Sequence, residues 1–197
     1  MKLFYSQPSP YVRLVRVFAH YHQLIDELEL INAKLGRNET ELRKVNPLGK
    51  IPALIDRDER CLYDSRTILY YLDSIGSGDK LFATNAAQHI SHQRDLAHLI
   101  GILELGVALV MDRRRNLHDM PDFMQERWMY GIRLALQELE FLYAKSLSPV
   151  LKLFTPVVVD WLQFRLPETM DLEQLPSLKA SLTVLQTRMY LDSDPRI

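Results

Sequence analysis

The chain of 197 residues contains a single cysteine, Cys61, so no disulfide can form within it. Such sparse use of cysteine is typical of proteins of the reducing cytoplasm. The sequence also lacks an uninterrupted apolar run of about 20 residues, which a membrane-spanning helix needs. Residues 1–5 have a strand-like pattern and lack the apolar stretch of a signal peptide. We therefore expect a cytoplasmic protein with no membrane partner.

Strong charge of one sign and a metal-binding pattern are missing too. The 24 lysines and arginines and the 25 aspartates and glutamates give a formal net charge of −1. Proteins that bind nucleic acids or acidic membranes are commonly basic instead. His89 and His92 are spaced so that they could share a helix face, but no third ligand follows them. We expect neither a nucleic acid partner nor a metal site.

The sequence that is present divides into two parts. Hydrophobic residues make up 47% of the chain and charged residues 25%, as in ordinary globular proteins. The glycine-containing interval at residues 76–80 is a natural linker, and no convincing strand follows it. We therefore predict an N-terminal α/β domain at residues 1–75, a linker at 76–84 and an all-α helical domain at 85–197.

Residues 1–75 have a pattern of strands and helices in the order β-α-β-α-β-β-α. Ser9 fits as the N-cap of the first helix, with Pro10 at the first helical position, where its missing N–H costs nothing. Asp64 and Ser65 precede the apolar periodicity of the last helix in the same way. The expected strands are 2–5, 26–32, 50–55 and 61–63, and the expected helices are 11–21, 39–44 and a third from residue 65 onward.

Three features gather between Val45 and Ser65: a proline bend at 51–52, a polar turn at 57–60 that leads into a short strand, and a helix start at 64–65. Ile51-Pro52 interrupts a strand-like run, and the bond before a proline is the only common place for a cis peptide. A bend there would turn the N–H and C=O of Ile51 towards a ligand beside the sheet. The helix start at Asp64-Ser65 offers free N–H groups and a positive dipole end, which favour a carboxylate. Together these features suit one end of a peptide-like ligand.

The segments NPLGKIPAL and LYDSRTILYYLD resemble the glutathione-binding half of the cytosolic glutathione S-transferase superfamily. The resemblance implies the GST fold, a thioredoxin-like domain with a mixed four-stranded sheet followed by a helical domain. It also implies glutathione as co-substrate, with Lys50 at the glycyl carboxylate and Ile51, before the cis-proline Pro52, pairing its backbone with the cysteinyl moiety. Asp64 and Ser65 would hold the γ-glutamyl end. The simpler alternatives are a solvated Lys50 and a plain helix cap at Asp64-Ser65.

Ser9 occupies the position at which thioredoxin-like proteins carry the cysteine of Cys-Pro-Tyr. A hydroxyl cannot form a mixed disulfide with glutathione, but at a helix start it can donate a hydrogen bond to a bound thiolate, the nucleophilic form. We therefore predict Ser9 as the catalytic residue. The alternatives are that Ser9 only caps its helix, or that Ser6 or Tyr5 activates the thiol.

The second half of the chain has helical periodicity throughout. The family usually opens the buried helix of this domain with a Ser/Thr-x-x-Asp capping box, but Pro149 and Lys152 occupy those positions here. We expect a buried helix that includes residues 155–164, and either Ser148 or Thr155 could cap it; each is followed by a proline. The expected helices are 88–112, 121–145, 155–164 and 178–189.

Two functions are consistent with these patterns. The first is a glutathione transferase that acts on a small electrophilic or apolar second substrate. The second is a non-catalytic binding protein of the same fold, similar to the stringent starvation protein. The resemblance also implies a homodimer. Residues 113–115 are three arginines, which indicate either a solvated helix end or contact with an anionic substrate.

Overall fold

The computed structural model describes residues 1–33, 35–36, 39–82, 85–114, 122–145 and 148–196. These residues form two compact units. The first unit comprises residues 1–89 and the chain from Thr187 onward, and the second comprises residues 90–186. The domain limits drawn from the sequence stay a prediction, but they differ from these units because the last stretch of chain packs with the first unit.

A mixed four-stranded sheet lies in the first unit, with the strand order β2-β1-β3-β4. Strand β1 runs parallel to β2 and antiparallel to β3, and β3 runs antiparallel to β4. The order of strands and helices is the predicted one, although the second strand is shorter because a 3-10 turn occupies its first residues. The strands are β1 (Lys2–Tyr5), β2 (Glu29–Asn32), β3 (Ala53–Ile55) and β4 (Cys61–Leu62), and the turn is η1 (Ile25–Glu27).

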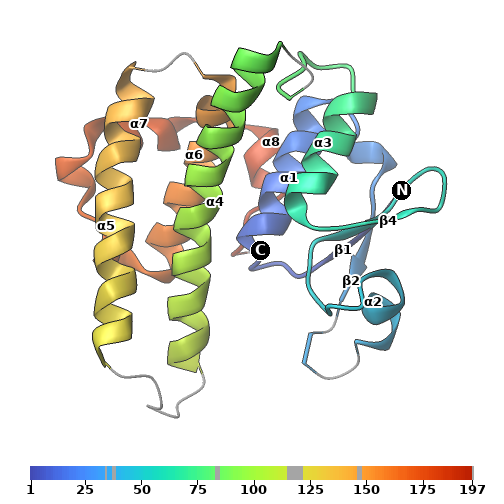
Figure 1. Cartoon of the computed structure of the whole chain (residues 1–197), viewed down its shortest axis with the longest axis horizontal. Coiled ribbons are helices and arrows are strands. Elements are labelled where there is room, and N and C mark those ends of the chain that lie inside the picture. The colour runs from blue at the N-terminus through green and yellow to red at the C-terminus, as the bar shows by residue number, and fades with distance from the viewer. Residues whose placement is uncertain (34, 37–38, 83–84, 115–121, 146–147, 197) are drawn as a thin grey trace. The chain divides into compact units, whose positions relative to one another are not determined.

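Helices cover both faces of this sheet. Side chains alternate between the faces along each strand, so Phe4 and Ala53 pack in one cluster with the buried side chains of helix α2 (Thr40–Val45). Leu3 and Leu54 are paired in the ladder and fully buried, and they point to the opposite face. Helices α1 (Pro10–Tyr21) and α3 (Ser65–Ile75) cover that face and lie side by side (Figure 1).

The C-terminal ends of α1 and α3 are tied together. His22 Nε2 lies 3.2 Å from Asp73 Oδ1, and the Ser77 amide donates to the His22 carbonyl at 3.2 Å. The buried Asp73 carboxylate also accepts from the amides of Leu81 at 2.8 Å and Phe82 at 3.0 Å. The two helices have 12 and 11 residues. Since they are nearly equal in length, their N-terminal ends also lie at one end of the unit.

The second unit consists of helices, and within the described residues no strand follows Leu81. A glycine, Gly106, allows two of these helices to pack closely, because a Cβ there would lie 2.8 Å from the Trp161 ring. Across the described helices, none combines the length and the apolarity needed to cross a membrane. The helices after the linker are α4 (Ala86–Arg114), α5 (Asp122–Lys145), α6 (Pro149–Arg165) and α7 (Pro176–Ser181), with 3-10 turns η2 (Pro167–Thr169), η3 (Leu172–Gln174) and η4 (Leu182–Gln186).

Helix α6 corrects one expectation. It begins earlier than residue 155: of the two candidate caps Ser148 is its N-cap residue, and Thr155 and Pro156 lie inside the helix. The residues from Phe154 to Val159 are buried, and they extend the core to which the first turn of α6 already contributes. The helix therefore runs through Thr155 and does not begin there. The residue three positions after Ser148 is the buried Leu151, which explains why no acidic partner completes a capping box there.

The predicted last helix at 178–189 is wrong. Helix α7 ends at Ser181, the turn η4 follows, and a separate short helix, α8 (Arg188–Leu191), begins after Thr187. The Ser181 hydroxyl donates to the Leu178 carbonyl at 2.6 Å and the Thr183 hydroxyl to the Ala180 carbonyl at 2.9 Å. Side-chain hydrogen bonds of this kind compete with the helical backbone ladder. Helix α8 packs on α1.

Candidate functional site

Three segments emerge at the same end of the sheet. Strand β1 ends at Tyr5, and the antiparallel β3 begins at Ala53, opposite Phe4. Leu62, the last residue of β4, lies opposite Leu54 of β3. The chain that leaves β1, the chain that enters β3 and the chain that leaves β4 are therefore neighbours. These segments contain the predicted site residues, Ser9, Lys50, Ile51, Pro52, Asp64 and Ser65.

Ser9 is the N-cap residue of α1, as predicted. Its Oγ accepts a hydrogen bond from the Val12 amide at 3.3 Å, and Pro10 is the first helical residue. The Ser9 amide donates to the Ser6 carbonyl at 3.1 Å, which closes a tight turn between β1 and α1. Since capping uses only a lone pair of the hydroxyl, its O–H remains able to donate to a ligand.

The Ile51-Pro52 peptide bond is cis, as the motif indicated. Ile51 lies just before β3, outside the ladder whose first pair is Phe4 with Ala53. Its side chain packs on the buried cluster of Phe4 and Ala53, and Pro52 is buried. Lys50, one residue earlier, is exposed. The bend is thus anchored by apolar side chains and places the Ile51 backbone at the margin of the sheet.

Asn46 supports this bend, and the sequence reasoning did not identify it as a site residue. Its side chain is 2% exposed. Its Nδ2 donates to the Lys50 carbonyl at 2.8 Å and its Oδ1 accepts from the Leu48 amide at 3.1 Å. The Gly49 amide donates to the Asn46 carbonyl at 2.9 Å. An asparagine before a proline is a known sign of such a side-chain-closed turn and could have revealed this role.

Asp64 and Ser65 open helix α3, as predicted. Asp64 is the N-cap residue, and its Oδ1 accepts from the Arg66 amide at 3.0 Å. Its side chain is 65% exposed, and its second carboxylate oxygen, Oδ2, lies 4.0 Å from Arg66 Nη1. Ser65 is buried as the first residue of the helix. The helix start favours an anion, and the carboxylate beside it favours an ammonium group.

The arrangement suits a zwitterionic peptide. The N-terminal ends of α1 and α3 both carry a positive dipole end, and both lie at the end of the unit where the chain passes from Ile51 into β3. An α-amino acid group, with one ammonium and one carboxylate, matches Asp64 and the start of α3. A peptide backbone matches the Ile51 margin, and a thiolate matches the Ser9 hydroxyl at the start of α1.

Other candidate residues from the sequence do not join this arrangement. Arg113 pairs with Glu168 within the second unit, and Arg114 is exposed. Arg115 lies outside the described residues. His89 Nδ1 bonds the Phe82 carbonyl at 2.6 Å. Within the part of the chain that the structure describes, no three His, Cys, Asp or Glu side chains gather as a metal-binding group.

Solved structures of similar proteins agree with this fold over the whole chain. A glutathione transferase family member from Pseudomonas fluorescens Pf-5, solved with bound S-(propanoic acid)-glutathione, is 28% identical and matches 100% of both chains with a TM-score of 0.86. A glutathione S-transferase from Methylobacillus flagellatus, solved with glutathione bound, is 28% identical, covers 98% of each chain and has a TM-score of 0.88.

Curated sequences are similar over shorter stretches. The uncharacterized GST-like protein YibF from Escherichia coli K12 is 25% identical over 115 residues, which is 58% of this chain and 56% of YibF. The chain spans 11% to 56% of the lengths of the curated relatives it matches.

The family comparison concerns the first unit. Residues 8–75 match the glutathione S-transferase N-terminal domain, and this stretch holds every predicted site residue. The fold of a thioredoxin-like mixed sheet followed by a helical domain is the one that the solved structures share. Residues 8–75 therefore form a glutathione S-transferase N-terminal domain, and the chain has the GST fold.

Proposed function

We propose that this protein is a glutathione transferase that joins the thiol of glutathione to a small electrophilic or apolar second substrate. The observation that carries the proposal is the convergence of Ser9, the cis Ile51-Pro52 bend and the Asp64 helix start at one end of the sheet. The two neighbouring proteins solved with glutathione or its thioether support it.

The tripeptide would lie along the margin of β3. The backbone of Ile51 would pair with its cysteinyl residue as an added strand does, through main-chain hydrogen bonds. The γ-glutamyl ammonium would meet Asp64, its carboxylate would meet the start of α3, and the exposed Lys50 would meet the glycyl carboxylate. Each charged end of the ligand then faces a group of opposite charge, while the thiol points to the start of α1.

Ser9 would stabilise the thiolate. A free thiol has a pKa near ~8.5, and a decrease of about two units requires ~2.7 kcal/mol of preferential stabilisation of the thiolate. One charge-assisted hydrogen bond from the Ser9 O–H and the dipole of α1 are together of that size. The proton leaves the sulfur for solvent, and the thiolate forms the new S–C bond as the leaving group departs from the electrophile.

Calorimetric titration of the protein with glutathione tests the binding part of this proposal. We expect saturable binding, and we expect Asp64→Asn to weaken it about tenfold because one hydrogen bond to a charged group is lost. Asparagine also caps helices well, so α3 should stay folded. The control is Asp79→Asn, an exposed aspartate in the linker, which should bind normally. No detectable heat at millimolar glutathione would refute the proposal.

Turnover separates the enzyme from the non-catalytic alternative. A panel of aryl halides and other electrophiles, assayed with glutathione, should reveal at least one conjugation reaction. Tight binding of glutathione without turnover of any electrophile would favour a binding protein of the same fold. The homodimer implied by the resemblance stays a prediction that light scattering can check.

A further inference from the structure

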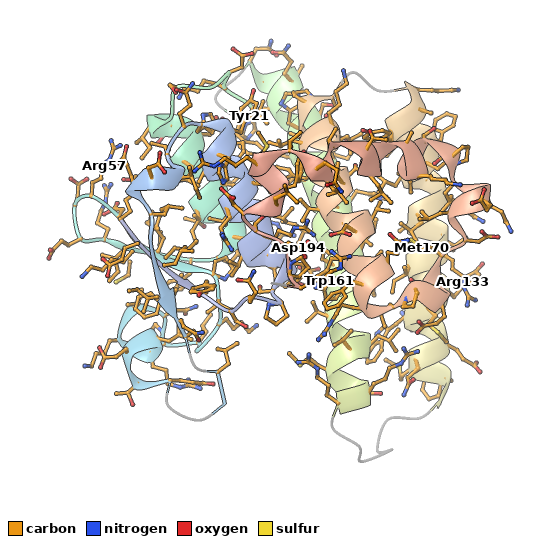
Figure 2. All side chains as sticks on the ribbon, turned by 180° about the vertical axis from the view of Figure 1, so that it is seen from behind. Tyr21, Arg57, Arg133, Trp161, Met170 and Asp194 are labelled. Atoms are coloured by element: carbon orange, nitrogen blue, oxygen red, sulfur yellow. The ribbon has the colours of Figure 1, made fainter. Side chains whose placement is uncertain are left out.

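The chain after the second unit returns to α1 and contacts it near Ser9. We name residues 188–196 the clasp segment. Gln7 Nε2 donates to the Asp194 carbonyl, and Arg16 Nη2 donates to the Asp192 carbonyl. His20 Nε2 lies 3.1 Å from Asp192 Oδ2. Figure 2 labels Asp194 beside α1. The clasp segment therefore runs along the helix that Ser9 caps.

The clasp segment is locally well fixed, so the Asp194 carbonyl is a defined acceptor. The Asp194 amide donates to the Leu191 carbonyl at 3.0 Å. The Asp194 carboxylate accepts from the Arg196 amide at 2.8 Å and from Arg196 Nη1 at 3.1 Å. Tyr190 is 5% exposed and Ser193 2% exposed. These contacts hold the carbonyl in place independently of Gln7.

Gln7 lies in the middle of the turn that presents Ser9. This turn is closed by the Ser9 amide on the Ser6 carbonyl at 3.1 Å, and Gln7 is the residue directly after Ser6. The cap hydrogen bond between Ser9 Oγ and the Val12 amide is long, at 3.3 Å. A hydrogen bond weakens steeply when its donor and acceptor are misaligned, so a bond from the Ser9 O–H to a ligand depends on where that hydroxyl points. Its direction is fixed only as firmly as the turn that carries Ser9.

We propose that Gln7 is a positioning residue, whose hydrogen bond to the clasp segment fixes the turn that aims the Ser9 hydroxyl at the glutathione sulfur. This inference rests on the proposed function. It makes thiol activation at the start of the chain depend on residues nearly two hundred positions away. Glutathione affinity, in contrast, depends on Lys50, Ile51 and Asp64, which Gln7 does not hold.

Titration of the bound thiol, followed by the ultraviolet absorbance of the thiolate against pH, tests this dependence. Gln7→Met keeps the length of the side chain and removes its donor, and Gln7→Asn shortens the amide by one methylene. In both variants we expect roughly three- to tenfold less thiolate at neutral pH. This decrease corresponds to the partial loss of one hydrogen bond, from the Ser9 hydroxyl to the sulfur. Their affinity for glutathione by calorimetry should be unchanged. In a Ser9→Ala background, Gln7→Met should have no further effect.

The matched control is His20→Gln, which replaces the imidazole in a different contact between α1 and the same clasp segment, at Asp192. His20 lies in the last turn of α1, whereas Ser9 caps the first turn. Arg16 contacts the clasp segment between these two ends of the helix, so His20 is the contact farther from Ser9. His20→Gln should therefore leave the thiol titration unchanged. Thermal unfolding of each variant shows whether the protein remains folded.

The outcomes separate this inference from the proposed function. If Ser9→Ala lowers the thiolate fraction but both Gln7 variants titrate like the wild type, the positioning role is refuted and the proposed function stands. If His20→Gln changes the titration as much as Gln7→Met does, the effect is general loosening of the clasp segment, and the specific role of Gln7 is refuted. If Ser9→Ala changes nothing, the positioning role is refuted and Ser9 is removed from the mechanism, while the proposed function stands with another activating group. If glutathione does not bind, both are refuted.

Discussion

The side chain of Asn46 donates a hydrogen bond from Nδ2 to the backbone carbonyl of Lys50, at 2.8 Å, across the loop that leads into the cis-proline. The same buried side chain accepts from the Leu48 amide. One residue therefore fixes both ends of the loop, and it determines where Lys50 and Ile51 lie relative to the sheet.

Asn46→Ala should loosen that loop. Removing the side chain leaves a carbonyl and an amide without their partner, which costs about 1–3 kcal/mol of folding free energy. Because Lys50 and Ile51 would then be poorly placed, we also expect roughly tenfold weaker binding of glutathione, or about 1.4 kcal/mol. Chemical denaturation and calorimetry measure the two effects. Leu48→Ala is the control, since that side chain is 64% exposed and should change little.

Substitutions at Ser9 should separate capping from thiol activation. Ser9→Ala removes both, so we expect a loss of about 1 kcal/mol in stability. We also expect a tenfold to hundredfold lower kcat/KM, on the order of 1.5–3 kcal/mol for a hydrogen bond to a charged group. Ser9→Asp should keep the cap and the stability, but its negative charge opposes the thiolate.

The two Ser9 variants are compared by thermal unfolding and by conjugation of an aryl halide. Full activity in Ser9→Ala would remove Ser9 from the mechanism. Ser6→Ala and Tyr5→Phe, assayed in parallel, would then show which of the rival groups activates the thiol.

Asp56 should make the stability depend on acid pH. Burial of its carboxyl acts to raise its pKa, but hydrogen bonds from Arg60 and from the Asp58 amide outweigh this and lower the pKa. The unfolded value is about 3.9. A carboxyl whose folded pKa is depressed contributes its full stability above the unfolded pKa and loses it as pH falls through the folded pKa.

Asp56→Asn should therefore lower the stability at neutral pH by about 1–3 kcal/mol, through the loss of hydrogen bonds to a charged acceptor. It should also flatten the dependence of unfolding on pH below about pH 4, since this carboxyl no longer titrates. Denaturation curves at several pH values measure both effects. Asp58→Asn serves as the control, because the Asp58 side chain is 70% exposed; an equal change in that variant would contradict the assignment.

Glu140 lies in α5 and caps the start of α7, so its side chain should stabilise the second unit. Its carboxylate accepts from the amides of Ser177 and Leu178, both at 2.9 Å, at the start of α7. Glu140→Ala leaves these amides without their acceptor, so we expect a loss of about 1–2 kcal/mol by chemical denaturation. The neighbouring Glu138 lies 3.6 Å from Arg94, and both are about half exposed. Glu138→Ala should cost far less, as exposed ion pairs do.

Local signals explain what the sequence predicted well. Ser9 with Pro10, and Asp64 with Ser65, mark helix starts by their own chemistry, and the structure has caps at Ser9 and Asp64. The choice between Ser148 and Thr155 could not be made locally, because each is followed by a proline. The helix is capped by Ser148 because the residues around Thr155 are buried in its interior, and burial is a property of the folded unit.

Long-range partners explain what the sequence could not predict. Asp73 accepts from Leu81 and Phe82, and Glu140 caps a helix that begins 36 positions later, at Pro176. Nothing in the residue types of these acids distinguishes them from solvated ones. Gln7 is a similar case, since its partner is an ordinary backbone carbonyl, and only the fold brings that carbonyl to it.

The first unit is built from two stretches of chain, residues 1–89 and those from Thr187 onward. During synthesis the ribosome therefore releases the whole second unit before the surface of α1 receives its last covering residues, which include the buried Tyr190 and Ser193. The first unit therefore cannot reach its final packing until residues 188–196 have been translated. The turn of residues 6–9 is thus translated long before Asp194, the residue whose carbonyl completes its contacts.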